Sequence, residues 1–415
     1  MTTQDTLSRS VALAERQVPV CIVGNGAIAK TCALALAQAG FQVLMLVPPQ
    51  AGAAAPRPST DWDLRVYALN NTAHDLLSGL KVWGAMQQER IAPVEGMQII
   101  GDAGDGSAGK LDFDAFSAHV ERLAFILEDG NLNQALDTAL RFAPNLEILP
   151  AQALALRSDE QRAELDVRDG SGQMLRIVTE LLIGADGAQS WVRGQLDIGL
   201  DYRPYGQTAI VCNFACAKPH HGVAWQWFLS GQGILALLPL PGDQVSMVWS
   251  APQALAAQWL HHPVEELARH VEELCANQFG ALTPLPPQQA RGFPLQLMRP
   301  HSVIAPHVAL IGDAAHVVHP LAGHGMNLGF ADIAALLQAL QERAPQRSAG
   351  DAQVLAQYAR ARKEDVMLMQ FTTDALARLF GSELGPLRAV RNLGLNLLDK
   401  FPVLKRQLIA QAIGK

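Results

Sequence analysis

The sequence predicts an α/β fold: a Rossmann-like domain, an antiparallel sheet inserted into it, and a helical C-terminal region. Two observations predict the Rossmann-like part. The chain opens with a βαβ pattern around a glycine loop, and a buried strand much later runs into a Gly-Asp turn at residues 308–313. The third observation is the alternating, aromatic-rich pattern of residues 205–250, which is typical of an antiparallel sheet.

The first element is a β-branched strand at residues 18–23, followed by an alanine-rich helix and a second buried strand at residues 41–47. The loop after the first strand has the spacing G-x-G-x-x-A. Its glycines, Gly24 and Gly26, let the backbone approach a pyrophosphate, and the small residue Ala29 lets the helix pack on the strand. The alternative is a glycine turn that binds no ligand.

One part of the dinucleotide-binding pattern is missing. An Asp or Glu about 20 residues after the glycines normally holds the ribose hydroxyls. That place is occupied here by Val47 and Pro48, and no acidic residue occurs between Gly26 and Asp61. We expect Gln50 or a backbone group to take over the contact.

A second glycine-containing turn follows an apolar strand at residues 181–183. The strand runs into Gly-Ala-Asp-Gly, ending in Asp186 and Gly187, and Ser190 can cap the next helical turn. Alone, a turn of this kind is more often structural than functional. Its position between two other glycine-containing segments favours a shared cofactor site.

The third segment runs from Val308 to Ala331 and reads VALIGDAAHVVHPLAGHGMNLGFA. Asp313 follows the strand directly and is placed to accept hydrogen bonds from a sugar or polyol hydroxyl. Gly323-His324-Gly325 then opens a long apolar helix. The start of such a helix offers free N–H groups and roughly half a positive charge, which suits an anionic oxygen.

GDAAH followed by HPLAGHGMNLG resembles the second FAD fingerprint of the aromatic-ring flavoprotein hydroxylases, most closely their ubiquinone-biosynthesis branch, and the similarity extends along nearly the whole chain. The resemblance implies a fold of the p-hydroxybenzoate hydroxylase type, FAD as cofactor and NADPH or NADH as co-substrate. Arg65 matches an Arg that lies against FAD in the family; its alternative is an ion pair with a nearby Asp. The implied cofactor-binding residues are Gly24, Gly26, Ala29, Arg65, Asp186, Gly187, Gly312, Asp313, Gly323, Gly325, Met326 and Asn327.

The resemblance also implies that the backbone around Pro320 and the following helix start faces the isoalloxazine, which makes His319, Pro320 and His324 the candidate catalytic residues. His324 stands where relatives usually have Gln, and we expect its protonated form to help hold a reduced, anionic flavin. A metal site at His316, His319 and His324 is the weaker interpretation, because no acidic or Cys partner is close in sequence.

The family uses the antiparallel sheet as the floor of an aromatic substrate site. The candidate substrate residues are therefore Trp225, Gln226, Trp227 and Pro239, although aromatic residues on a sheet belong to the core more often than to a pocket. Relatives usually carry Arg at the position of Trp227. The FAD-binding domain is expected to be discontinuous, with residues 1–70, 115–195 and 300–345. The substrate domain is expected to be inserted into it and to comprise residues 71–114 and 196–299. Residues 346–415 are expected to form a helical C-terminal region.

Composition limits the class of protein. With 415 residues, 49% of them hydrophobic, the chain can form two or more structural units. Its net charge of −7 argues against nucleic acid as a partner, because binding to phosphates needs a basic surface. The five cysteines form no C-x-x-C pair, which favours reduced thiols in the cytoplasm and no metal site. No apolar run reaches the roughly 18 residues of a membrane span.

Residues 386–415 carry six basic residues against one acid, with leucines at helical spacing. A basic amphipathic helix can lie on an anionic membrane surface; the alternative is a terminal helix packed on the body. A polyprenyl substrate resides in the bilayer, so we expect a cytoplasmic protein that binds peripherally at the inner face of the membrane.

The function implied by the resemblance is hydroxylation of the aromatic ring of a polyprenylphenol intermediate in ubiquinone biosynthesis, with NAD(P)H and O2. One alternative is a flavin-dependent reductase of prenyl lipids. Another is a non-catalytic isoprenoid-binding subunit of a ubiquinone-biosynthesis complex, which the missing ribose carboxylate keeps open. Ring position, prenyl chain length, nicotinamide preference and oligomeric state do not follow from the sequence.

Overall fold

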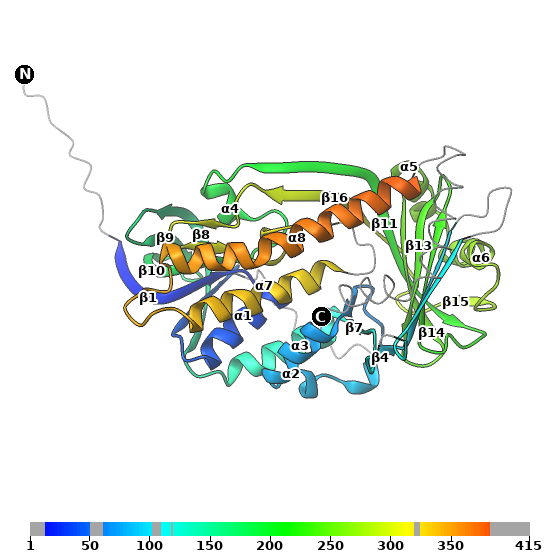
Figure 1. Ribbon diagram of the computed structural model, residues 1–415, viewed down its shortest axis with the longest axis horizontal. Helices are drawn as coiled ribbons and strands as arrows, with labels where there is room; N and C mark the ends of the chain where they lie inside the picture. The colour runs from blue at the N-terminus through cyan, green and yellow to red at the C-terminus, as the bar shows by residue number, and fades with distance from the viewer. Residues whose placement is uncertain (1–12, 50–60, 102–108, 118, 319–323, 382–415) are drawn as a thin grey trace, which may run out of the picture.

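The computed structural model describes residues 13–49, 61–101, 109–117, 119–318 and 324–381. Two large sheets lie toward opposite ends of the molecule, and long helices run beside the first of them (Figure 1). Two paired strands, β11 (Leu200–Cys216) and β16 (Arg291–Pro300), run from the region of the first sheet into the second.

The first sheet has seven strands in the order β1-β2-β8-β9-β10-β18-β17, and β1 also pairs with β10. Strands β8, β2, β1, β10 and β18 pair in parallel, in the order expected of a Rossmann-like core, while β8, β9 and β10 also form an antiparallel meander. The strands are β1 (Ala14–Val23), β2 (Val43–Val47), β8 (Leu146–Ser158), β9 (Ala163–Asp169), β10 (Met174–Gly184), β17 (Ile304–Ala305) and β18 (Val308–Leu310).

Helices cover one face of this sheet. The alanines of the first helix, including Ala33 and Ala37, are buried and let it lie close to the strands. The helix at residues 352–381 is tied to the sheet by the Tyr358 hydroxyl, which donates to the Leu310 carbonyl (2.7 Å). The helices at this end are α1 (Ala27–Gln38), α2 (Asn71–Gly79), α3 (Asp129–Arg141), α4 (Trp191–Gln195), α7 (His324–Gln341) and α8 (Ala352–Gly381).

The second sheet has eight strands: seven follow the order β15-β11-β14-β13-β12-β5-β6, and β16 pairs with β11. Helices α5 (Gln253–His261) and α6 (Val264–Leu274) pack on one of its faces, where Leu267 and Val271 join the core of that sheet. The other face is turned toward the first sheet. The remaining strands are β5 (Gly96–Ile100), β6 (Lys110–Asp114), β12 (Val223–Leu229), β13 (Gly233–Leu240), β14 (Gln244–Pro252) and β15 (Leu282–Pro284).

A three-stranded sheet, β3-β7-β4, lies beside the two large ones and consists of β3 (Val66–Leu69), β7 (Ala124–Glu128) and β4 (Ile91–Val94). Helix α2 and the residues after it differ from the expected division of the chain. Ala73, Val82 and Met86 pack in the core of the first sheet, although the sequence predicts that residues 71–114 belong to the substrate domain. The cause is the buried apolar face of α2, which contacts α7.

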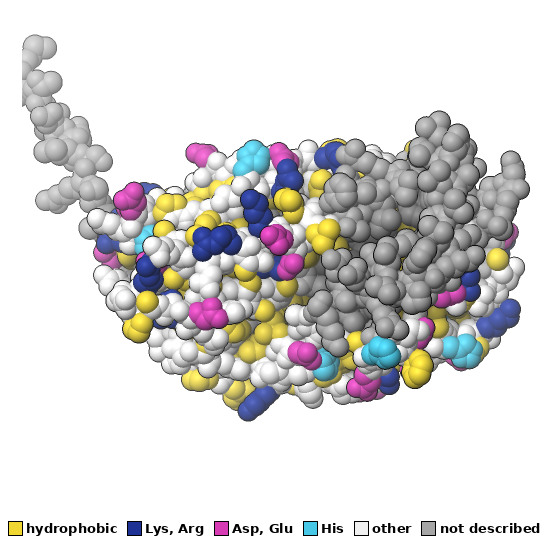
Figure 2. All heavy atoms as spheres, in the orientation of Figure 1, with side chains coloured by type: hydrophobic (Ala, Val, Ile, Leu, Met, Phe, Trp, Pro, Cys, Tyr) yellow, Lys and Arg dark blue, Asp and Glu magenta, His cyan; other side chains and the backbone are white. Residues whose placement is uncertain are grey.

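Acidic and basic side chains are interspersed over the described part of the face shown in Figure 2. The predicted basic helix at residues 386–415 lies outside the described residues. Within the described residues, no helix has a stretch that is long and apolar enough to cross a membrane.

Candidate active site

A cavity of about 1070 Å³ lies between the first sheet and the second. Its walls come from the glycine loop after β1, the turn after β10, the Gly-Asp turn after β18, the start of α7, and the inner face of the second sheet. Small-molecule sites typically measure roughly 300–1,000 Å³. The cavity lies at the upper end of this range, which suits a ligand as large as a dinucleotide.

The glycine loop has the close backbone contacts that a dinucleotide site requires. Gly24 has φ +144°, and a Cβ there would lie 2.3 Å from the Ala185 carbonyl oxygen, so only glycine fits between the ends of β1 and β10. Gly26 precedes α1, and among the described residues no side chain caps this helix. A Cβ on Gly26 would meet no atom within 4 Å. Gly26, Ala27 and Ile28 line the cavity, so the free amides of the first turn of α1 lie at its wall, while Ala29 packs against Gly24.

The turn after β10 is joined to the Gly-Asp turn by a residue that sequence reasoning missed. Arg193 is buried and donates through Nη1 to the Ala314 carbonyl (2.9 Å) and through Nη2 to the Ala188 carbonyl (2.8 Å). Asp186 Oδ2 accepts from the Val192 amide (3.1 Å), whereas its buried Oδ1 has no hydrogen-bond partner in the described part of the chain. The predicted cap is present: Ser190 Oγ accepts from the Arg193 amide (3.0 Å).

The Gly-Asp turn is held by a buried carboxylate on α7. Asp332 Oδ2 accepts from the Gly312 amide (2.9 Å) and lies 2.6 Å from His316 Nε2, and Oδ1 accepts from Arg362 Nε of α8 (2.8 Å). Burial alone would raise the pKa of Asp332, but the charges and hydrogen bonds of His316 and Arg362 hold it below its usual value. The His316 side chain is therefore a structural partner of Asp332.

Asp313 extends from that turn into the cavity. Its carboxyl is open to the cavity space but enclosed by protein on other sides, and this desolvation raises its pKa against the opposing effects of His316 and Arg65. A carboxylate in such a place is stabilised when ligand hydroxyls donate to it. Gly312 itself does not line the cavity; it has φ +60° and lies against Ile28.

Five further side chains meet at the edge where α1, β3 and α3 approach. Arg65 lines the cavity, and the described residues give its guanidinium no ion pair with an Asp, which was the alternative interpretation. The Tyr67 hydroxyl and Asn133 Nδ2 both donate to Asp129 Oδ1 (2.7 Å each), and Lys30 reaches the same region. Sequence reasoning missed Lys30 and Asp129 as cavity residues; the signal was a charged residue within an otherwise apolar first helix.

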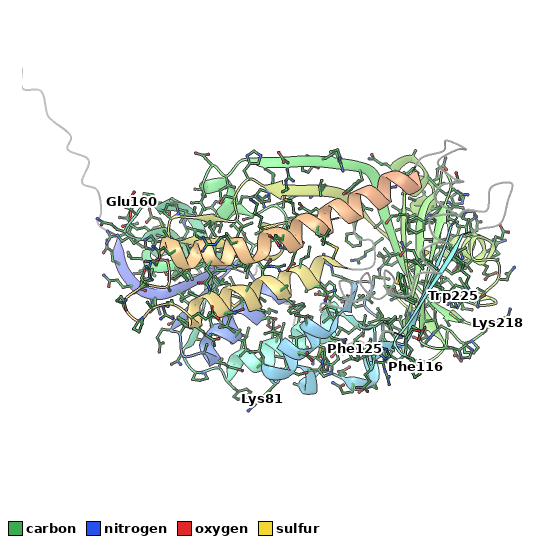
Figure 3. All side chains as sticks on the ribbon, in the orientation of Figure 1. Lys81, Phe116, Phe125, Glu160, Lys218 and Trp225 are labelled. Carbon is green, nitrogen blue, oxygen red and sulfur yellow. The ribbon has the colours of Figure 1, made fainter. Side chains whose placement is uncertain are left out.

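The inner face of the second sheet forms the opposite wall. Gln226 lines the cavity as predicted, but Trp225, Trp227 and Pro239 do not. Side chains alternate along a strand, so the neighbours of Gln226 point to the other face. There Trp225 and Trp227 stack with ring centroids 5.6 Å apart, and both approach Phe279; Figure 3 labels Trp225. The prediction for these three residues is corrected, and the wall consists instead of Ala209, Val211, Gln226, Ile234, Ala236, Leu238, Val248, Ser250, Phe293 and Leu295.

The remaining predicted residues belong to the start of α7. Gly325 and Met326 line the cavity. Asn327 does not: its side chain accepts from the Asn70 amide (3.0 Å) and donates to the Ala68 carbonyl (2.8 Å), which anchors α7 to the β3–α2 connection. His324 is the first residue of α7. Gln50, His319, Pro320 and Gly323 lie outside the described residues.

Comparison with known proteins agrees with this geometry. The family described as "FAD binding domain" matches residues 17–371. The 3-demethoxyubiquinol 3-hydroxylase of Escherichia coli (strain K12) is 33% identical over 402 residues, covering 95% of this chain and 98% of that protein. This chain belongs to the FAD-dependent hydroxylases of ubiquinone biosynthesis. Another relative of these hydroxylases, the ubiquinone hydroxylase UbiL of Rhodospirillum rubrum, is 32% identical, with 97% of this chain and 90% of that protein covered.

Solved structures of other proteins share the fold of this hydroxylase. The p-nitrophenol 4-monooxygenase PnpA of Pseudomonas putida DLL-E4 has a TM-score of 0.72 at 17% identity, with 96% of this chain and 98% of that chain covered. HpxO of Klebsiella pneumoniae, complexed with FAD and uric acid, has a TM-score of 0.70 at 15% identity, with 95% and 97% covered. The predicted fold class, the FAD cofactor and the assignment to FAD-dependent aromatic hydroxylases are confirmed.

Proposed function

We propose that this hydroxylase acts on the aromatic ring of a polyprenylphenol intermediate of ubiquinone biosynthesis, with NAD(P)H and O2 as co-substrates. The observation that carries the proposal is the pairing of two unlike walls in one cavity. One wall has the glycine loops and carboxylates of a dinucleotide site, and the other is an almost entirely apolar sheet face. An aromatic ring with a hydrocarbon substituent fits the second wall.

The first wall has residues that fit FAD, which supplies the oxygen-transfer chemistry when bound. The free amides after Gly26 suit its pyrophosphate, and Asp313 suits its polyol hydroxyls. Gly187 lines the cavity beside Asp186 and leaves the backbone accessible there. The amides at the start of α7, next to Gly325, would favour negative charge at that end of the cofactor.

The second wall would position the substrate ring. Ala209 and Ala236 are small and lie within the wall, where they leave room for a flat ring. Gln226 and Ser250 are its polar residues, and both side chains are buried. The Gln226 amide can both donate and accept a hydrogen bond at the cavity wall, so it is suited to bind an oxygen substituent of the substrate. The apolar surroundings exclude water from the reaction.

The roles of His319, Pro320 and His324 remain proposals based on the family resemblance. We propose that the backbone of this segment faces the isoalloxazine and that His324 supports the reduced flavin. We also propose that residues 386–415 bind the membrane surface and that the protein belongs to a biosynthetic complex. Flotation with anionic vesicles tests the membrane binding, and the chain truncated after residue 385 is the control.

Oxygen-coupled turnover tests the proposed reaction. We expect the purified protein to show a flavin absorption spectrum, which NADPH or NADH bleaches faster when a polyprenylphenol is present. With ¹⁸O2, one labelled oxygen atom should enter the aromatic ring. Reduction of the prenyl lipid without incorporation of oxygen would contradict the proposal and support the flavin-dependent reductase instead.

A further inference from the structure

We propose that Lys30 is a binding residue for the FAD pyrophosphate and that it replaces affinity lost with the missing ribose carboxylate. The inference does not rest on the identity of the proposed substrate, because it concerns only the end of the cavity near α1. It starts from a difference between this chain and the usual dinucleotide pattern, in which β2 ends in an acidic residue. Here β2 ends at Val47, and Pro48 lines the cavity.

Lys30 is a buried cation. It is 6% exposed, on a helix whose other buried residues are small or apolar apart from Thr31. Lysine is almost never this buried unless it is paired, because desolvation of an ammonium is costly. The buried ammonium of Lys30 therefore needs polar or anionic partners, and the cavity that Lys30 lines is one place where an anion can approach it.

The protein partners of Lys30 fix its ammonium without using all of its donors. Nζ lies 3.1 Å from Asn133 Oδ1 and 2.6 Å from Asp137 Oδ1, both on α3. Asn133 is held in turn, because its Nδ2 donates to Asp129 Oδ1 (2.7 Å) and to the Asp129 carbonyl (3.0 Å). The side-chain oxygen of Asn133, Oδ1, is thereby turned toward Lys30. An ammonium has three N–H donors, and acceptors among the described residues account for two of them.

The position of Lys30 along α1 puts it beside the expected phosphates. Its amide donates to the Gly26 carbonyl (3.0 Å), so it begins the second turn of the helix whose first amides face the cavity. Of the cavity-lining residues that the structure describes, the only Lys or Arg side chains are those of Lys30 and Arg65. A helix start offers roughly half a positive charge to two phosphates. Lys30 adds a full charge at the same end.

Titration of the FAD-free protein with FAD tests the inference through affinity rather than activity. Lys30→Met keeps the volume and apolar stem of the side chain and removes the charge. We expect it to weaken FAD binding roughly 10- to 100-fold, the loss typical of one hydrogen bond to a charged group. The dependence of the affinity on salt should also decrease, because one cation fewer meets the phosphates. Lys30→Arg should recover part of the affinity.

Asp137→Asn is the matched control. It removes the ion pair of Lys30 at its solvent-exposed side, where Asp137 is 51% exposed, and keeps the lysine. If Lys30 only joins α1 to α3, the Met and Asn variants should shift the thermal unfolding midpoint and the FAD affinity alike, and the inference is overturned. We expect instead that Asp137→Asn changes FAD affinity less than about three-fold, which is under 1 kcal/mol.

Competition by parts of the cofactor identifies the group that Lys30 contacts. ADP carries both phosphates, whereas adenosine carries only the ribose and base. Lys30→Met should weaken ADP and leave adenosine unchanged; equal weakening of both would place Lys30 at the ribose and contradict the pyrophosphate assignment. If the Met variant does not fold, Lys30→Gln gives the same comparison. Normal FAD affinity in Lys30→Met would overturn the inference, whereas a failure of the unchanged protein to hydroxylate a polyprenylphenol would contradict only the proposed function.

Discussion

The wall of the cavity that contains the glycine loops is held by a few strong contacts, whereas the wall formed by the second sheet is held by many weak ones. In the first, Gly24 touches Ala185 and Asp332 lies between His316 and Arg362. In the second, one apolar face of a regular sheet is presented. We expect substitutions in the first wall to remove the site as a unit, and substitutions in the second to alter it by degrees.

The largest effect is expected at Arg362. Arg362→Met leaves the buried Asp332 without its arginine partner, and loss of one partner of a buried ion pair typically costs about 3–5 kcal/mol of unfolding free energy. Arg360→Met is the control, because Arg360 is an exposed residue of the same helix and such changes usually stay within about 0.5 kcal/mol. Chemical denaturation of both variants gives the comparison; equal values would show that Asp332 is not a strong contact.

The same network predicts how stability depends on pH. The pKa of Asp332 is lower in the folded protein than its ordinary value, so its carboxylate contributes stability above roughly pH 4. This contribution is lost as the pH falls through the folded-state pKa. Denaturation of Asp332→Asn between pH 3 and 7 should therefore show a flatter acid limb than the unchanged chain. If stability falls equally with decreasing pH in both proteins, the lowered pKa of Asp332 is contradicted.

A smaller effect separates the two glycines of the first loop. Gly24→Ala forces a side chain against the Ala185 carbonyl at a φ that L residues rarely adopt, and we expect a loss of roughly 2–4 kcal/mol. Gly26→Ala meets no protein atom and should keep the unfolding midpoint, but its methyl group would occupy space needed by the cofactor. Thermal unfolding and FAD titration distinguish the two. Destabilisation by Gly26→Ala would contradict this account.

The smallest effects are expected on the second wall. Gln226→Leu should raise KM for the phenolic substrate up to about ten-fold, because one hydrogen bond is worth on the order of 1 kcal/mol, and should leave FAD affinity unchanged. Trp225→Phe alters the opposite face and should leave KM as it is. Steady-state kinetics on both variants checks which side chains of β12 point into the cavity. A change of KM in Trp225→Phe alone would indicate that Trp225, and not Gln226, faces the substrate.

The comparison also explains which parts of the site were predictable from the sequence. Gly24, Gly26, Asp186 and Asp313 were found because each stands at a fixed distance from a strand end, and that relation is local. The sequence did not reveal which face of the second sheet lines the cavity. Trp225 and Gln226 are adjacent, and only the packing of α5 and α6 decides which face is covered.

Contacts between distant segments could not be predicted for a related reason. Arg193 holds the Ala314 carbonyl across 121 positions of sequence, and Arg362 meets Asp332 from another helix. Both are arginines without a local motif. The missing carboxylate after β2 was visible in the sequence, but the cation near the same end, Lys30, was not recognised because its partners come from α3.

The contacts made by α8 have a consequence for how the enzyme acquires its flavin. Tyr358 and Arg362 hold β18 and Asp332 in place, and both come far later in the chain than the first glycine loop at residues 24–29. The strand β18 and the Gly-Asp turn therefore have all of these contacts only once Tyr358 and Arg362 have been synthesised. We therefore expect a chain that terminates before Arg362 to bind flavin poorly and to be colourless when purified.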